Sequence, residues 1–211
     1  KTILDSGEIG EVFKGRVTFT SAFPVFDNQP NLAKLDQFIL ADIGSHTLDM
    51  VRFLFGEAAN LHCITQRVNP NIAGEDVANV LLEMHSGVHC YAEMSYASVL
   101  EKEAFPHTLL LIEGSEGSIR LDQNYRIIVT TREGSYRKVA TPKKYKWVNP
   151  DYALVHSSMV DINRDFLTAL QNGTLPETTA ADNYRTLQLV YECYRSAKMK
   201  QVITLEEPIF S

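Results

Sequence analysis

Hydrophobic and polar residues alternate with a period of two along much of the chain. This alternation predicts strands over residues 12–23, 61–68, 76–85, 88–98, 108–113, 118–122, 126–131 and 136–140, with a short last strand at 202–205. Turn-like residues join most of these segments, and Ser86 with Gly87 is typical of a tight hairpin. Strands connected this closely are expected to be antiparallel neighbours.

Three segments have helical spacing instead. Residues 43–55 place their apolar side chains on one broad arc and are followed by Gly56, a common helix stop. Residues 155–171, followed by Asn172 and Gly173, and residues 180–200 predict two closing helices. Residues 6–11 read as a turn, and residues 28–31, with Pro30, are expected to form a loop.

A helix, a run of strands and two closing helices together predict an α+β fold. We expect a single domain over residues 1–211, built on a large, mostly antiparallel open sheet with helices packed on one face. The strands carry too many apolar residues for a sheet with a wetted face: Val80, Leu82, Tyr91, Tyr96, Leu109 and Leu111. The uncovered face is therefore expected to be available for oligomerisation, as a homodimer or homotetramer.

Composition narrows the classes of partner. The chain has 211 residues, of which 45% are hydrophobic, and a formal net charge of −6. Its most basic cluster, Lys143, Lys144 and Lys146, is too short for a nucleic-acid footprint. No apolar run approaches the roughly 18 residues of a membrane span. We therefore expect neither nucleic acid nor a membrane as partner.

The cysteines indicate a reducing compartment. Cys63, Cys90 and Cys193 are odd in number, widely spaced and set among apolar residues. This pattern predicts reduced core thiols in a cytoplasmic protein rather than disulfides or a zinc site. The first residue, Lys1, suggests a trimmed or excised chain, so its native N-terminus is unknown.

Candidate chemistry is concentrated on the predicted helix at 43–55 and the residue before it. Asp42, His46 and Asp49 follow one another at intervals of four and three, so on a helix they share a sector about 60° wide, opposite the apolar arc. A carboxylate beside an imidazole fixes its tautomer and raises its basicity, which suits acid–base catalysis. The helix N-terminus is expected to favour the anionic form of Asp42.

The same pattern has other interpretations. Asp42 could be only an N-cap, while His46 and Asp49 could be an ordinary solvated face. A metal site built from these three residues is another alternative, although further His or Cys ligands are not nearby. His156, at the start of a closing helix, could reach a substrate cleft or be a surface residue. The residues alone leave these alternatives open.

Residues 42–49, DIGSHTLD, resemble the D-x-G-x-H-x-x-D signature of the glucose–fructose oxidoreductase / inositol dehydrogenase / MocA family (Gfo/Idh/MocA). Other stretches resemble motifs of that family in the same order: residues 7–12, 75–78, 114–119, and the two closing helices at 165–173 and 182–197. The likeness extends over nearly the whole chain. Each motif is weak alone, but together in this order they are fairly specific.

The resemblance implies a function that is shared between two domains. Members join an N-terminal Rossmann domain to a C-terminal α+β domain, and they transfer hydride between NAD or NADP and a hydroxyl carbon of a sugar or polyol. By the same resemblance, His46 transfers the proton of the substrate hydroxyl and Asp42 supports it. Asp49 and His156 are assigned only a substrate-side or structural part, and no residue of this chain is assigned to cofactor or metal binding.

Two motifs of the family are absent from the sequence. Neither the G-x-G-x-x-G dinucleotide fingerprint nor the E-K-P motif occurs. We therefore expect the chain to be the substrate-binding half of a dehydrogenase, with its Rossmann domain missing and no turnover of its own. The alternative is a non-catalytic, oligomeric ligand-binding module of the same fold.

Overall fold

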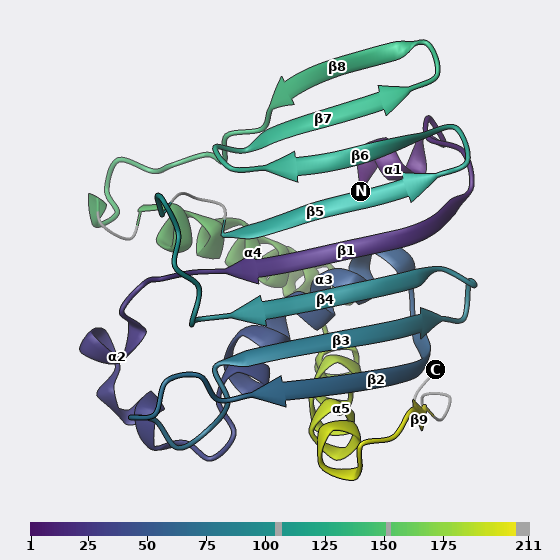
Figure 1. The fold of residues 1–211 in the computed structure, drawn as a ribbon. Helices are drawn as coiled ribbons and strands as arrows, with labels where there is room; N and C mark the ends of the chain where they lie inside the picture. The colour runs from purple at the N-terminus through teal and green to yellow at the C-terminus, as the bar shows by residue number, and fades with distance from the viewer. Residues whose placement is uncertain (104–106, 151–152, 206–211) are drawn as a thin grey trace.

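The computed structural model describes residues 1–103, 107–150 and 153–205, which form a nine-stranded sheet (Figure 1). The strand order is β8-β7-β6-β5-β1-β4-β3-β2-β9. The strands are β1 Val12–Thr20, β2 Ala58–Gln66, β3 Val77–Met84, β4 His89–Ser95, β5 Thr108–Gly114, β6 Gly117–Asp122, β7 Arg126–Thr131, β8 Gly134–Val139 and β9 Ile203–Thr204. The predicted strands are thus confirmed, with small shifts at their ends.

The central pair of strands, β1 and β4, is parallel, whereas the other neighbouring pairs are antiparallel. The register pairs Thr20 of β1 with Ser95 of β4, so the carboxyl ends of these two strands lie side by side. The expectation of a mostly antiparallel open sheet is confirmed. The parallel pair matters for function, because it brings two separate chain segments to the same edge of the sheet.

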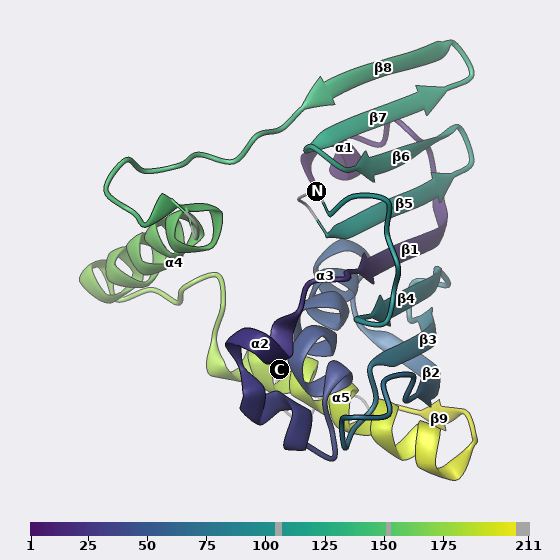
Figure 2. The same ribbon diagram turned by 60° about the vertical axis from the view of Figure 1, so that its left-hand side comes forward.

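The helices lie on one side of the sheet. The larger ones are α3 Ser45–Phe55, α4 Ala153–Asn172 and α5 Ala180–Met199, and a π-helical turn, η2 Leu40–Gly44, leads directly into α3. Helix α3 packs against the central strands β1 and β4, and α5 packs against β2 and β9 at one edge of the sheet, while α4 stands apart from the sheet (Figure 2). Smaller elements are α1 Thr2–Asp5, α2 Val25–Asn28 and the 3₁₀ helix η1 Pro30–Lys34. None of the described helices is long and apolar enough to cross a membrane.

The core lies between the sheet and these helices. In β3 the side chains of Ala78, Val80, Leu82 and Met84 are buried, and the residues between them are more exposed, as expected for a strand with one covered face. Gly15 of β1 allows α3 to come close: a Cβ atom there would lie 2.4 Å from the Cζ atom of Phe55. The absence of a side chain at Gly15 thus lets α3, the helix that carries the candidate chemistry, pack closely on β1.

Apolar residues on the two faces of the sheet have different surroundings. Val80 and Leu82 point to the helices and belong to the core, whereas the neighbouring Leu81 is 44% exposed on the open face. Tyr91 is also on the open face, where Arg16 lies over its ring at 5.7 Å from the centroid. The open face is therefore a mixture of apolar and charged side chains.

Two boundaries differ from the sequence-based expectation. Residues 28–31, expected as loop, include the end of α2 and the start of η1, because Pro30 occupies the first turn of a 3₁₀ helix, where its missing N–H group costs nothing. The helix expected from residue 43 begins at Leu40, in the π-helical turn. A π-helical turn interrupts the usual spacing, so the periodicity did not reveal it.

Candidate functional site

The helical segment that carries Asp42 is anchored at its amino end by a buried carboxylate. Glu75, just before β3, accepts hydrogen bonds from the backbone N–H groups of Phe38 and Leu40, each at 3.2 Å. Tyr194 of α5 donates its hydroxyl to Glu75 at 2.7 Å and accepts the N–H of Ala41 at 3.1 Å. N–H groups at a helix start need such partners. Glu75 and Tyr194 supply them, so the interpretation of Asp42 as an N-cap is wrong.

Asp42 therefore has its carboxylate available for other contacts. It is half-buried and accepts a hydrogen bond from the Tyr96 hydroxyl at 3.4 Å, and it interacts electrostatically with His46 one turn later. Burial raises the pKa of Asp42 above its ordinary 3.8, although the Tyr96 hydrogen bond and the charge of His46 act in the opposite direction. Loss of hydration thus outweighs both of these contacts, and the neutral carboxyl is favoured more than in water.

The three polar residues of the helix do not form one cluster. Asp42 and His46 lie close enough to influence each other, and the His46 side chain is exposed. Asp49 instead accepts a hydrogen bond from Thr186 of α5 at 2.8 Å. In the described part of the chain, no group of three or more His, Cys, Asp or Glu side chains is placed to hold a metal ion. The arrangement thus pairs Asp42 with His46 and directs Asp49 elsewhere.

A cavity of about 460 Å³ lies beside Tyr96, at the carboxyl ends of the parallel strands β1 and β4. Its walls are mostly apolar and include Phe19, Phe23, Ile43 and Leu154. A largely apolar cavity of this size with a few polar groups is typical of a small-molecule site. Since Tyr96 lines the cavity and donates to Asp42, the Asp42 carboxylate is next to the cavity.

His156 lies near this cavity without lining it. It is exposed in the first turn of α4, next to Leu154 and Val155, which do line the cavity. His46 is likewise outside the lining residues. Several polar residues that the sequence did not predict as site residues do line it: Ser21, His107, Tyr125 and Lys144. They were missed because they belong to segments that are far apart in the chain.

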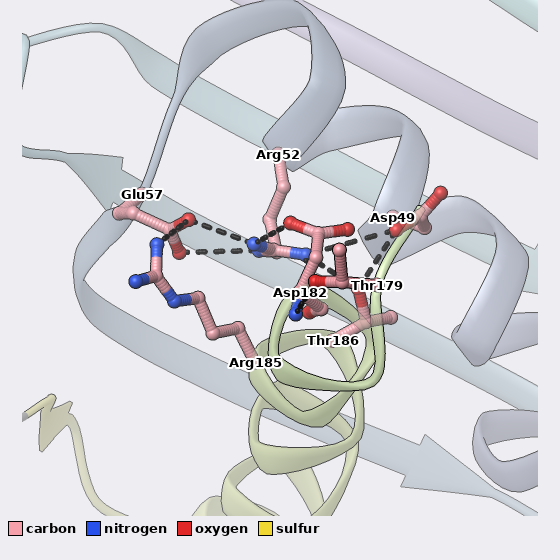
Figure 3. A network of polar contacts seen from close by, with 7 residues as sticks. All are labelled: Asp49, Arg52, Glu57, Thr179, Asp182, Arg185 and Thr186. Carbon is pink, nitrogen blue, oxygen red and sulfur yellow. Dashed lines mark hydrogen bonds and ion pairs between the residues drawn. The ribbon is translucent and has the colours of Figure 1, made fainter. Parts of the chain in front are cut away.

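Helix α3 is tied to α5 by a buried guanidinium group (Figure 3). The Arg52 side chain is 5% exposed and binds Glu57 through two nitrogens at 2.8 and 3.1 Å. It also binds the Asp182 carboxylate at 2.9 Å and the Thr186 hydroxyl at 2.8 Å. Asp49 lies 3.7 Å from Arg52 and accepts from the same Thr186. One cation thus joins α3, the turn after it and the first turns of α5.

The charges in this network stabilise one another. Burial alone would raise the pKa of Glu57, but the hydrogen bonds and charges of Arg52 and, to a smaller extent, Arg185 together outweigh burial and lower that pKa. Along α3 alone, Asp49 and Arg52 are three residues apart, a spacing typical of a modest surface ion pair. Spacing along one helix cannot show that α5 covers the guanidinium and that Glu57 and Asp182 converge on it.

Comparison with known proteins gives consistent matches. The family model described as GFO/IDH/MocA C-terminal domain matches residues 1–120. A D-apiose dehydrogenase of Paraburkholderia graminis is 43% identical over 203 residues, covering 96% of this chain and 54% of that protein. A D-apiose dehydrogenase of Rhizobium rhizogenes is 43% identical over 197 residues, covering 93% of this chain and 57% of that protein.

A similar solved structure is an oxidoreductase of Agrobacterium radiobacter in complex with NAD+, L-tartaric acid and magnesium. It has 41% sequence identity and a TM-score of 0.92, and the match covers 97% of this chain and 60% of that chain. This chain therefore spans little more than half the length of the relatives it matches.

The Arg52 network generates a stability prediction. Arg52→Ala leaves Glu57 and Asp182 without their shared cation. Because these carboxylates are 32% and 42% exposed, the loss is expected to exceed that of a surface pair but not to reach that of a fully buried one, at about 1–3 kcal/mol. Urea denaturation followed by circular dichroism measures the loss. The matched control is Arg195→Ala, because Arg195 is a 56% exposed arginine of α5 paired with Glu192. We expect the control to cost about 0–1 kcal/mol, and equal losses in the two variants would contradict a special role for Arg52.

Asp42 generates a prediction with a pH dependence. Its folded-state pKa is raised above the ordinary 3.8, so ionisation of Asp42 costs stability progressively as the pH rises from 3.8 to the folded-state pKa, and the full cost is present above that pKa. Asp42→Asn removes this cost and can keep the Tyr96 contact, so the variant is expected to be more stable than the natural protein at neutral pH. The difference should shrink as the pH falls through the folded-state pKa and disappear below 3.8, where the carboxyl group is protonated in both states. Denaturation midpoints across this range test it, and a less stable variant at neutral pH would refute it.

Proposed function

The chain belongs to the Gfo/Idh/MocA family, and from that premise we propose that it is the substrate-binding half of an NAD- or NADP-dependent oxidoreductase that acts on a sugar or polyol. The observation that carries the proposal is the position of Asp42. Its half-buried carboxylate lies between the Tyr96 hydroxyl, which lines the cavity of about 460 Å³, and the imidazole of His46.

In the proposed mechanism, the substrate occupies this cavity with the hydroxyl to be oxidised toward Asp42 and His46. His46 takes the hydroxyl proton, and the negative charge of Asp42 stabilises the imidazolium that results. Tyr96 holds the Asp42 carboxylate by a hydrogen bond. Bound nicotinamide supplies the hydride acceptor. Apolar walls such as Phe23 and Ile43 keep water from the reacting hydroxyl.

The cofactor is proposed to bind mainly to a separate N-terminal Rossmann domain. Two observations support this division. The parallel strands β1 and β4 are separated in sequence by α3, β2 and β3, so they do not form the strand–helix–strand unit that binds dinucleotides. The matched relatives are also much longer than this chain, and one was solved with NAD+.

The substrate class is inferred from the relatives and the cavity. Two relatives at 43% identity are D-apiose dehydrogenases, which makes an aldose the first substrate to assay. The three free cysteines, all buried, support a cytoplasmic setting. We further propose that the open face of the sheet pairs with a second copy, as a homodimer or homotetramer.

The catalytic assignment is tested by His46→Ala in the full-length protein. Loss of the proton-transfer group is expected to lower kcat about 10²–10⁴-fold with little change in folding, because His46 is exposed. The assay follows NADH or NADPH formation with D-apiose, D-xylose, D-ribose, D-glucose and myo-inositol.

His85→Gln provides the control, since His85 is an exposed histidine in the β3–β4 turn, at the opposite end of these strands from the cavity. Unchanged kcat in His46→Ala would remove His46 from the mechanism. A full-length protein that oxidises none of these compounds would favour the non-catalytic, ligand-binding alternative.

The oligomer is tested at Leu81. Leu81→Arg places a charge in the middle of the open face and is expected to dissociate the assembly, as measured by sedimentation velocity of the full-length protein. Leu187→Arg on α5 is the control, because Leu187 is 48% exposed, close to the 44% of Leu81, but lies on a helix. An unchanged sedimentation coefficient for Leu81→Arg would place the interface elsewhere.

A further inference from the structure

A second imidazole–carboxylate pair borders the same cavity. His107, just before β5, lines the cavity, and its Nδ1 atom lies 2.9 Å from a carboxylate oxygen of Glu103. The His107 side chain is 17% exposed. A carboxylate at Nδ1 fixes the orientation and the tautomer of an imidazole ring. The ring is therefore held in a defined position at the cavity wall.

Glu103 is itself held by the end of β1. Its carboxylate accepts hydrogen bonds from the backbone N–H of Ala22 and from the hydroxyl of Ser21. Ser21 is 1% exposed and in turn accepts the N–H of Phe23 at 3.0 Å. These contacts make Glu103 a positioning residue, because it acts on the cavity through His107.

Phe19 relates this second pair to the first. The Phe19 ring packs edge-on against Tyr96, with centroids 5.3 Å apart, and edge-on against His107, with centroids 6.1 Å apart. Tyr96 is hydrogen-bonded to Asp42, and His107 is paired with Glu103. Two polar groups, each oriented by its own carboxylate, thus face one cavity from positions around a single aromatic ring.

We propose that His107, positioned by Glu103, binds a substrate hydroxyl other than the one that is oxidised and thereby determines which sugars are accepted. The inference rests on the proposed function, since it assumes that a sugar or polyol occupies this cavity. Most of the cavity wall is apolar, so a polar group placed there discriminates strongly. A site built to hydrogen-bond a hydroxyl discriminates against an analogue that lacks it, because the hydrogen bond to the sugar is then lost.

The test compares sugars that differ by one hydroxyl. In the full-length protein, KM and kcat are measured for the aldose of the panel that is oxidised best and for each of its singly deoxygenated analogues. His107→Leu is expected to raise KM for the parent sugar about 10–100-fold with little change in kcat, as loss of one hydrogen bond to substrate predicts. One deoxy analogue should have a much lower kcat/KM than the parent sugar with the natural protein. With the His107→Leu variant, this analogue and the parent sugar should have similar kcat/KM values.

Further variants separate recognition from folding. His107→Asn keeps a polar side chain and should recover part of the affinity, Glu103→Gln should give an intermediate KM, and His85→Gln should leave KM unchanged. Thermal unfolding is measured for each variant. The inference is wrong if the His107→Leu variant discriminates among the deoxy analogues as the natural protein does. It is also wrong if the variant has the same rise in KM for every sugar together with a lower melting temperature, because the pair then only anchors its loop.

Failure of the proposed function gives a different result. If the natural protein oxidises no sugar of the panel, binding of the same sugars is measured by saturation-transfer NMR. Binding by the natural protein that is lost in His107→Leu supports the hydroxyl-binding role without redox chemistry. Equal binding by both proteins, or binding by neither, overturns it.

Discussion

The burial of the Arg52 guanidinium is the constraint on which the arrangement of the helices depends. A buried cation must have its hydrogen bonds satisfied, and the partners of Arg52 come from the turn after α3 and from the start of α5. If either helix rotated, the buried guanidinium would lose Glu57 or Asp182. The network therefore selects one relative position of α3 and α5, and with it the height of Asp42 and His46 above the sheet.

The opposite end of the same helical segment is held in an equally specific way. Glu75 and Tyr194 satisfy the amide groups at its start, which relieves Asp42 of a capping role. Asp42 is left half-buried with a raised pKa, so ionisation of this carboxylate works against folding. Such a residue is explained more readily by chemistry than by stability, in keeping with the tendency of perturbed carboxylates to mark functional sites.

The parallel pairing of β1 and β4 explains why a cavity lies at this edge of the sheet. Phe19 and Ser21 come from the end of β1, and Tyr96 follows the end of β4. In an entirely antiparallel sheet, adjacent strands end at opposite edges, and these side chains would not meet. The crossover from β1 through α3 to β4 thus brings the acid–base pair, the aromatic wall and the Glu103–His107 pair to one place.

Periodicity and turn residues were sufficient to predict the strands, the three large helices and the α+β class, because each depends on neighbours within about ten residues. The motif around Asp42 and His46 was also visible, since both lie one turn apart on one helix. Contacts between distant segments were not visible: the capping of Phe38 by Glu75, the burial of Arg52 under α5, and the meeting of Tyr96 with His107 around Phe19. A linear pattern reports which face of an element is apolar, but not which element covers it. Polar groups become buried and converge only when the chain packs. In this protein, packing places Asp49 in the Arg52 network and Asp42 beside the cavity, although both residues belong to one helical segment.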